Sequence, residues 1–206
     1  FLHTLPPLQP VSPGAGGSET QAGDLVGPYR LVRELGRGGM GIVYLARNTS
    51  LQRLCALKIL SPKHIEADDD FIRRFQNEGR AAAALVHPNV VTTHAIGQTD
   101  DFHFLEMEYV PGGSLQGEID REGPIGPIRS TSMAAGIAAG LAMAHRLQLV
   151  HRDLKPENVM LGDYGEVLVM DWGLALPVST FRRYSSVGHN HSMGGTPAYM
   201  APEMAT

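Results

Sequence analysis

Residues 151–158 read His-Arg-Asp-Leu-Lys-Pro-Glu-Asn, and two short apolar runs follow them, at 159–161 and 167–170. Gly and Asp residues between the runs predict a β-hairpin. The hairpin would bring Asn158, just before its first strand, and Asp171, just after its second, to the same open end. An amide oxygen and a carboxylate suit Mg²⁺, which fills its other coordination positions with water and phosphate.

Asp153 and Lys155 lie two residues apart in the same stretch. A carboxylate close to a metal–phosphate cluster can orient a hydroxyl group and take its proton as the oxygen attacks. The stretch therefore indicates phosphoryl chemistry.

A buried ion pair is predicted between a strand and a helix further upstream. In the strand-like run 54–60, alternation places Lys58 on a face with small and apolar residues. Residues 68–85 predict a helix, and Glu78 lies in the middle of its apolar stripe. The stripe comprises Phe71, Phe75, Ala82 and Leu85. A buried carboxylate needs a cation, and Lys58 is the expected partner; the alternatives are a lysine facing water and a glutamate at the edge of the stripe.

Gly36-Arg37-Gly38-Gly39-Met40-Gly41 lies between two strand-like runs, 29–35 and 42–46. Dinucleotide sites, plain hairpins and loops that cover phosphates with backbone N–H groups share this pattern. A dinucleotide site needs a helix after the glycines, and residues 42–46 are strand-like. The plain hairpin and the phosphate-covering loop both stay open on this pattern alone.

The order of the remaining elements predicts an α+β chain in two lobes. Strands dominate up to a further run at 102–110, and a helix at 129–147 precedes the hairpin. Its stripe comprises Met133, Ile137, Leu141 and Ala144. Residues 1–28 are rich in Pro and Gly and poor in apolar side chains, which predicts a flexible leader.

The composition excludes several classes of protein. The 206 residues include 17 basic and 21 acidic side chains, a net charge of −4, which gives no reason to expect nucleic acid as a partner. No apolar run approaches the roughly 18 residues of a membrane span, and the first residues do not form a signal peptide. The single Cys55 cannot form an intrachain disulfide, so a reducing, cytoplasmic compartment is expected.

Taken together, the motifs resemble the protein kinase signature, and their sequences are most similar to those of bacterial eukaryote-like (Hanks-type) serine/threonine kinases. The resemblance implies a two-lobed protein-kinase fold with a β-rich N-lobe and hinge over residues 29–110. A partial, mainly helical C-lobe would cover 111–206, in a chain truncated after its last motif. The motifs are the glycine loop, Lys58, Glu78, residues 151–158, Asp171-Trp172-Gly173, Ala201-Pro202-Glu203 and His87-Pro88-Asn89-Val90-Val91.

This resemblance implies transfer of the ATP γ-phosphate to a Ser or Thr hydroxyl of a protein substrate. Asp153 would be the catalytic base and Lys155 would steady the transferred group. Asn158 and Asp171 would hold Mg²⁺, for which Mn²⁺ could substitute. Lys58, held by Glu78, would bind the α- and β-phosphates. The other ATP-binding positions would be Leu35, Gly36, Gly38, Gly41, Val43, Ala56, Met107, Glu108, Val110 and Met160.

The resemblance also implies regulation by phosphorylation, because an arginine directly before the base, here Arg152, marks the class of kinases whose activation loop is often phosphorylated. The expected autophosphorylation sites are Ser185, Ser186 and Ser192. Thr196 is expected to bond near Asp153 instead. No membrane span is expected in this segment, and a membrane anchor beyond residue 206 of the parent chain is left open.

Two positions depart from the family pattern. Trp172 replaces the usual Phe and is expected to remain a large apolar plug. Glu106 stands where an apolar residue is usual, and the sequence offers no account of it. Two other interpretations stay open, a pseudokinase or ATP-binding scaffold and a truncated fragment without turnover, although the presence of every catalytic and metal-binding position favours a catalytic design.

Overall fold

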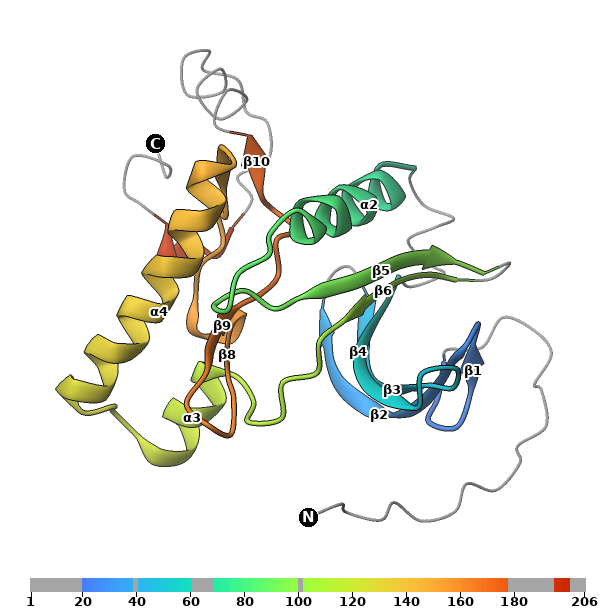
Figure 1. Cartoon of the computed structure of the whole chain (residues 1–206), viewed down its shortest axis with the longest axis horizontal. Helices are drawn as coiled ribbons and strands as arrows, with labels where there is room; N and C mark the ends of the chain where they lie inside the picture. Colours follow the sequence, from blue (N-terminus) through green and yellow to red (C-terminus); the bar gives the residue numbers. More distant parts are fainter. Residues whose placement is uncertain (1–19, 39–40, 61–68, 100–101, 178–194, 201–206) are drawn as a thin grey trace.

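A curled antiparallel sheet forms the N-terminal lobe in a computed structural model of the chain (Figure 1). The structure describes residues 20–38, 41–60, 69–99, 102–177 and 195–200. The sheet order is β1-β2-β3-β4-β6-β5, and helix α2 (Asp69–Ala83) lies beside it. The strands are β1 (Leu25–Val26), β2 (Tyr29–Gly38), β3 (Gly41–Asn48), β4 (Arg53–Leu60), β5 (Thr93–Gln98) and β6 (His103–Met107).

The sheet buries apolar side chains on both faces because its strands alternate in the expected way. In β4, Cys55, Leu57 and Ile59 join a cluster on one face with Tyr29 and Phe104. The other face carries Ala56 and Leu60, which pack with Phe75 of α2 and Leu105 of β6. The second face also carries Lys58, so the sheet presents that ammonium group toward α2.

The second lobe consists of helices α3 (Leu115–Glu122) and α4 (Pro127–Arg146) with a hairpin of β8 (Val159–Leu161) and β9 (Val167–Val169). The short strands β7 (Leu149–Val150) and β10 (Leu176–Pro177) form a second pair. The short 3-10 turns η1 (Pro156–Asn158) and η2 (Pro197–Tyr199) complete the elements. This arrangement confirms the expected two-lobed α+β fold, and Figure 1 shows α4 on the side away from the sheet.

A short ladder joins the two lobes at the base of the hairpin. The Val91 N–H donates to Val169 O at 3.0 Å, and the Val169 N–H donates to Asn89 O at 2.9 Å. Gly140 of α4 lies against the same segment, where a Cβ atom would come within 2.6 Å of Asn89 O. The absence of a side chain at this position lets the helix approach and fixes the hairpin relative to the sheet.

The described elements correct several sequence expectations. The predicted leader, residues 1–28, overlaps the sheet, because β1 pairs with β2 at Val26 and Tyr29 and the Tyr44 hydroxyl bonds with Thr20. Residues 1–19 lie outside the described residues. The sequence interpretation missed β1, β5 and α3. The predicted hairpin is confirmed, and the helices predicted at 68–85 and 129–147 are present as α2 (Asp69–Ala83) and α4 (Pro127–Arg146).

No helix in the described ranges is long and apolar enough for a bilayer crossing.

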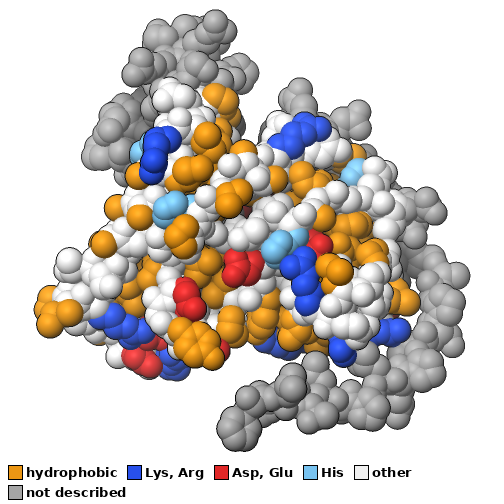
Figure 2. Space-filling model, viewed as in Figure 1, with side chains coloured by type: hydrophobic (Ala, Val, Ile, Leu, Met, Phe, Trp, Pro, Cys, Tyr) orange, Lys and Arg blue, Asp and Glu red, His pale blue; other side chains and the backbone are white. Residues whose placement is uncertain are grey.

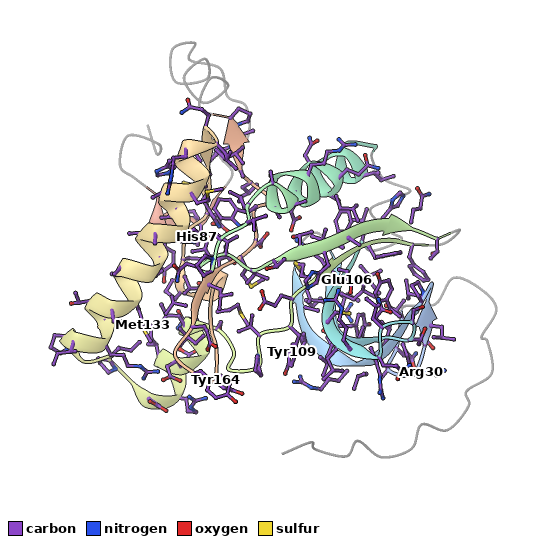
Figure 3. The ribbon with its side chains drawn as sticks, viewed as in Figure 1. Arg30, His87, Glu106, Tyr109, Met133 and Tyr164 are labelled. Carbon is purple, nitrogen blue, oxygen red and sulfur yellow. The ribbon has the colours of Figure 1, made fainter. Side chains whose placement is uncertain are left out.

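Glu106 has a clear structural role that the sequence did not reveal. Its side chain is 3% exposed and lies on the face of β6 that carries Phe104. Glu106 is labelled in Figure 3. The Tyr29 hydroxyl donates to its Oε2 and Arg53 Nη2 donates to its Oε1, both at 2.8 Å. Burial and this carboxylate raise the pKa of Tyr29 well above its ordinary value. Glu106 therefore links β2, β4 and β6 through one buried carboxylate.

We expect Glu106→Ala to lower the free energy of unfolding by about 2–3 kcal/mol, because it leaves the Tyr29 hydroxyl and Arg53 without their acceptor. The matched control is Glu34→Ala, which removes an exposed pair with Arg37 and should cost less than about 1 kcal/mol. Urea denaturation of both variants measures the difference. Equal costs would contradict a buried linking role for Glu106.

Candidate functional site

A cavity of about 740 Å³ opens between the sheet and the β8–β9 hairpin. Its volume lies within the usual range for cofactor and small-molecule pockets. Every ATP-binding position expected from the sequence lines it, together with Glu78, Asp153 and Asp171. Lining residues that the sequence interpretation missed include Arg33, Val91, Gly113, Ser114, Glu157 and Leu174. Most of these carry no motif, so only their position beside the cleft identifies them.

The β2–β3 turn covers one side of this cavity with glycines in two different situations. At Gly36 and Gly38 an added Cβ would meet no atom within 4 Å, so the backbone lies open to the cavity. At Gly41 a Cβ would lie 2.0 Å from Ile59 O. Gly41 is thus required by the sheet itself, whereas the first two glycines leave room for a ligand. Gly39 and Met40 lie outside the described residues.

Lys58 connects the sheet, α2 and the segment after β9. Its Nζ lies 2.6 Å from Glu78 Oε1 and 3.6 Å from Asp171 Oδ1. This confirms the ion pair predicted from the helical stripe, in which Glu78 is 3% exposed. Burial alone would lower the pKa of Lys58, but the carboxylates of Glu78 and Asp171 outweigh it and leave that pKa raised. Lys58 therefore carries its charge into the cavity.

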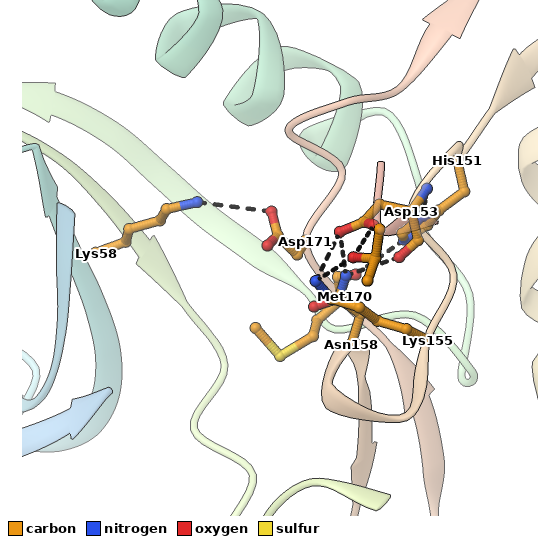
Figure 4. Close-up of polar contacts among 8 residues, drawn as sticks. Lys58, His151, Asp153, Lys155, Asn158, Met170 and Asp171 are labelled. Atoms are coloured by element: carbon orange, nitrogen blue, oxygen red, sulfur yellow. Dashed lines mark hydrogen bonds and ion pairs between the residues drawn. The ribbon is translucent and has the colours of Figure 1, made fainter. Parts of the chain in front are cut away.

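Asp153 is held by three neighbours at the mouth of the same cavity (Figure 4). Thr196 Oγ1 donates to Oδ1 at 2.8 Å, Lys155 Nζ lies 3.1 Å from Oδ2, and Asn158 Nδ2 donates to Oδ2 at 3.2 Å. Burial raises the pKa of Asp153, but the hydrogen bonds from Thr196 and Lys155 outweigh it and lower that pKa. Asp153 is thus an ionised acceptor, and the expectation that Thr196 bonds to it is confirmed.

His151 contacts the loop that carries Asp153, and Trp172 packs against His151. The Asp153 N–H donates to His151 Nδ1 at 3.2 Å, so the imidazole donates through Nε2 to Met170 O at 3.0 Å. Burial lowers the pKa of His151, which favours this neutral form. Trp172 is 2% exposed and its ring lies 4.6 Å from that of His151, edge to face. The apolar plug expected at Trp172 is present, and its buried Nε1 has no hydrogen-bond partner within the described ranges.

Asn158 and Asp171 lie at the same end of the hairpin, where the Met170 N–H donates to Asn158 O at 2.9 Å. Asn158 Nδ2 is bonded to Asp153, whereas Oδ1 accepts no hydrogen bond from a described residue. The side chain of Asp171 is 39% exposed toward the cavity. A free amide oxygen beside an accessible carboxylate is a donor set that fits Mg²⁺.

The segment after β6 forms the back wall of the cavity. Met107 and Val110 are each 7% exposed and lie in the same apolar cluster as Ala56, with Val43 and Met160 packed against it. The Glu108 N–H donates to Thr92 O at 2.8 Å. The Glu108 carbonyl and the Val110 peptide group make no hydrogen bond with the described chain. These groups are free to meet a flat polar ring between apolar walls.

Some expected sites fall on parts of the chain that are not described. Ser185, Ser186 and Ser192 lie outside the described residues, as do Ala201, Pro202 and Glu203.

Comparison with known proteins agrees with this geometry. A family model described as "Protein kinase domain" matches residues 29–206. The chain is 38% identical to the serine/threonine-protein kinase PrkC of Bacillus subtilis over 179 residues, which covers 87% of this chain and 27% of PrkC. It is 37% identical to PknE of Mycobacterium bovis over 188 residues, covering 91% of this chain and 32% of that kinase.

A third relative is PknD of Mycobacterium tuberculosis, which is 37% identical over 186 residues, covering 90% of this chain and 27% of PknD. The chain thus spans about a quarter to a third of the length of these curated relatives. Since the family model extends over nearly all the residues that build the two lobes and the cleft between them, this chain belongs to the protein kinase domain family.

Proposed function

We propose that the chain is a serine/threonine protein kinase domain that transfers the γ-phosphate of ATP to a hydroxyl group of a protein. The observation that carries this proposal is the meeting of Asp153, Lys155 and Thr196 at the mouth of a cavity whose interior holds Lys58 and Asp171. A carboxylate base and a nucleotide-sized cleft with an inward-facing cation are what phosphoryl transfer requires.

In this proposal the adenine ring lies between Leu35, Val43, Ala56 and Met160, against Met107 and the backbone of Glu108 and Val110. Gly36, Gly38 and Gly41 cover the phosphates, and Lys58 binds the α- and β-phosphates. Glu78 keeps Lys58 in place through its 2.6 Å ion pair.

The transfer step uses the residues around Asp153. The substrate oxygen attacks the γ-phosphorus, the bond to the β-phosphate oxygen breaks, and ADP leaves. The hydroxyl proton passes to Asp153, whose lowered pKa keeps it ionised before the step. Lys155, 3.1 Å from Asp153 Oδ2, steadies the transferred group, and Thr196 fixes Oδ1.

Asn158 and Asp171 would hold Mg²⁺, or Mn²⁺ in its place, through the free amide oxygen and the accessible carboxylate described above. When bound, this ion neutralises charge on the phosphates. Asp171 also reaches Lys58 at 3.6 Å, so the residues that would contact the metal and the phosphates form one connected group.

Incubation of the chain with Mg-ATP labelled at the γ-phosphate and a general protein substrate tests the proposal. We expect label on serine or threonine of the substrate and on Ser185, Ser186 or Ser192 of the chain. Nucleotide binding without any transfer would overturn it in favour of an ATP-binding scaffold or a fragment without turnover.

The different surroundings of Gly38, which faces open space, and Gly41, which lies against β4, give a separate prediction. We expect Gly41→Ala to destabilise the fold by about 2 kcal/mol or more, because the new Cβ meets Ile59 O. Gly38→Ala should change stability by less than about 0.5 kcal/mol and weaken ATP binding, because its Cβ enters the space proposed for the phosphates. Thermal unfolding and calorimetric ATP titration distinguish the effects. A Gly38→Ala chain with unchanged ATP affinity would contradict the phosphate-covering role.

A further inference from the structure

Four side chains form a row across strands β1 to β4, on the face of the sheet that also carries Lys58. In the strand register, Leu25 lies opposite Arg30, Arg30 opposite Arg47, and Arg47 opposite Leu54. We call these four residues the arginine row. Because neighbouring strands lie 4.7–4.9 Å apart, the row spans about 14 Å. Figure 3 labels Arg30, at the end of the sheet lobe away from the β8–β9 hairpin.

The two arginines of the row are direct cross-strand neighbours of like charge. Such neighbours have Cβ atoms about 4.5–5.5 Å apart, and like charges in these positions destabilise a sheet. Arg53, on the opposite face, is balanced by Glu106 at 2.8 Å. In the row, Arg30 Nη1 donates to the uncharged Gly23 O at 3.2 Å. Neither Arg30 nor Arg47 forms an ion pair with a described residue.

The acidic side chains nearest in sequence are engaged elsewhere. Asp24 Oδ2 accepts from the Gln21 N–H at 2.8 Å. Glu34 pairs with Arg37 at 3.1 Å. The repulsion within the arginine row is therefore not compensated by the part of the chain that the structure describes, and an anion from outside would relieve it.

Exposed apolar side chains lie at both ends of the row. Leu25 is 57% exposed and Leu54 is 38% exposed. Arg33 lies opposite Leu45 on the same face, one row nearer the large cleft, and adds a third positive charge. Figure 2 shows blue side chains along the lower edge of the sheet lobe, whereas the red ones visible in this view lie toward the middle and the second lobe. This face thus combines positive charge with apolar surface.

We propose that the arginine row binds a phosphoserine or phosphothreonine of a partner protein, in a segment where an apolar residue adjoins the phosphorylated one. A phosphate group carries nearly two negative charges and several acceptor oxygens, so one group can bond both guanidinium groups. Leu25 or Leu54 would contact the neighbouring apolar side chain.

The size of the arginine row favours this ligand over other anions. A nucleic acid binds through a succession of phosphate contacts, and an anionic membrane surface through clusters of roughly four or more basic residues. Two arginines between two leucines instead suit a single doubly charged group with an apolar neighbour. This surface is additional to the proposed transfer site and does not depend on its activity.

Fluorescence anisotropy tests the proposal, with a short labelled peptide that carries phosphothreonine between two leucines and no other Ser or Thr. We expect saturable binding without nucleotide that weakens with added salt. The double variant Arg30→Gln/Arg47→Gln should weaken it roughly tenfold. The matched control Arg146→Gln, at an exposed position of α4, should change affinity by less than about twofold. Calorimetric ATP affinity should stay unchanged in all variants.

Thermal unfolding provides a second readout. Arg47→Gln alone should not lower the melting temperature of the free chain, because it removes a repulsion between strands. The phosphopeptide should raise the melting temperature of the unmodified chain and leave that of the double variant unchanged. A clear loss of stability in Arg47→Gln would mean that Arg47 has a structural role in the sheet, which contradicts the proposal.

Three further results would overturn the proposal. Equal binding by the double variant would place the peptide elsewhere on the chain. Equal binding of the peptide without its phosphate would remove the role of the anion. Tighter binding to vesicles that contain anionic lipid than to the phosphopeptide would make a membrane the ligand. If the double variant is misfolded, Arg47→Gln alone should still weaken peptide binding roughly threefold, and unchanged binding in that variant would also refute the site.

Discussion

The variant Asp153→Asn should lose phosphoryl transfer by a factor of about 10²–10⁴ in kcat. An amide at this position can still accept from Thr196 and keep the local geometry, but it cannot take the proton of the attacking hydroxyl. ATP affinity should change by less than about twofold, because Asp153 lies at the mouth of the cleft. Steady-state kinetics and calorimetric ATP titration together measure the two effects.

The matched control is Asp120→Asn, which makes the same chemical change at an exposed position of α3 that contacts Gln116. It should retain the full rate. If Asp153→Asn retained more than about a tenth of the rate, Asp153 would not be the base. Loss of ATP binding in that variant would instead assign Asp153 to the nucleotide site.

The variant Lys58→Met should have two large effects. Transfer should fall by roughly 10²-fold or more, because the cation that stabilises the phosphates is gone. The fold should lose about 3–5 kcal/mol of stability, since the Glu78 side chain, 2% exposed, is left as an unpaired buried carboxylate. Denaturant titration and a transfer assay measure both.

The loss of stability should depend on pH with a defined sign. Burial raises the pKa of Glu78, and the positive charge of Lys58 is the largest influence that lowers this pKa. Without Lys58, folded Glu78 binds a proton at pH values where unfolded Glu78, with a pKa of about 4.3, is already ionised. Stability of Lys58→Met should therefore fall as the pH rises above about 4.3.

The double variant Lys58→Met/Glu78→Leu provides the control for this prediction. It replaces the pair by apolar side chains of similar size, so most of the stability should return, and the pH dependence that comes from Glu78 should disappear. Phosphoryl transfer should not return. If the single and double variants were equally unstable, the cost would come from lost packing around Lys58 and the buried carboxylate would not be its cause.

Local sequence patterns predicted much of the site because each part obeys a short-range rule. The helical period alone placed Glu78 on the buried face of α2, and the cost of burying a charge identified Lys58 as its partner. The turn between 161 and 167 predicted the hairpin, which in turn brings Asn158 and Asp171 to one end. At these positions periodicity or turn chemistry decides the structure, and the prediction succeeded.

Two of the failures have long-range causes. The burial of Glu106 depends on Tyr29, which lies 77 residues away in the chain, and no local pattern contains that contact. Strand β5 alternates only between half-buried and exposed positions and carries the 39% exposed Ile96, so it is defined by pairing with β6. Helix α3 had a readable signal, because Ser114 caps it by accepting from the Gly117 N–H.

Trp172, which packs under the loop that carries Asp153, is the sole tryptophan of the chain. The intrinsic ultraviolet emission therefore comes from one indole, located next to Asp171 and in edge contact with the ring of His151. Indole emission responds to solvation and to nearby rings. Any rearrangement of the segment that follows β9 should thus be visible in solution without an attached dye, in a chain that carries its own optical reporter beside its proposed metal ligand.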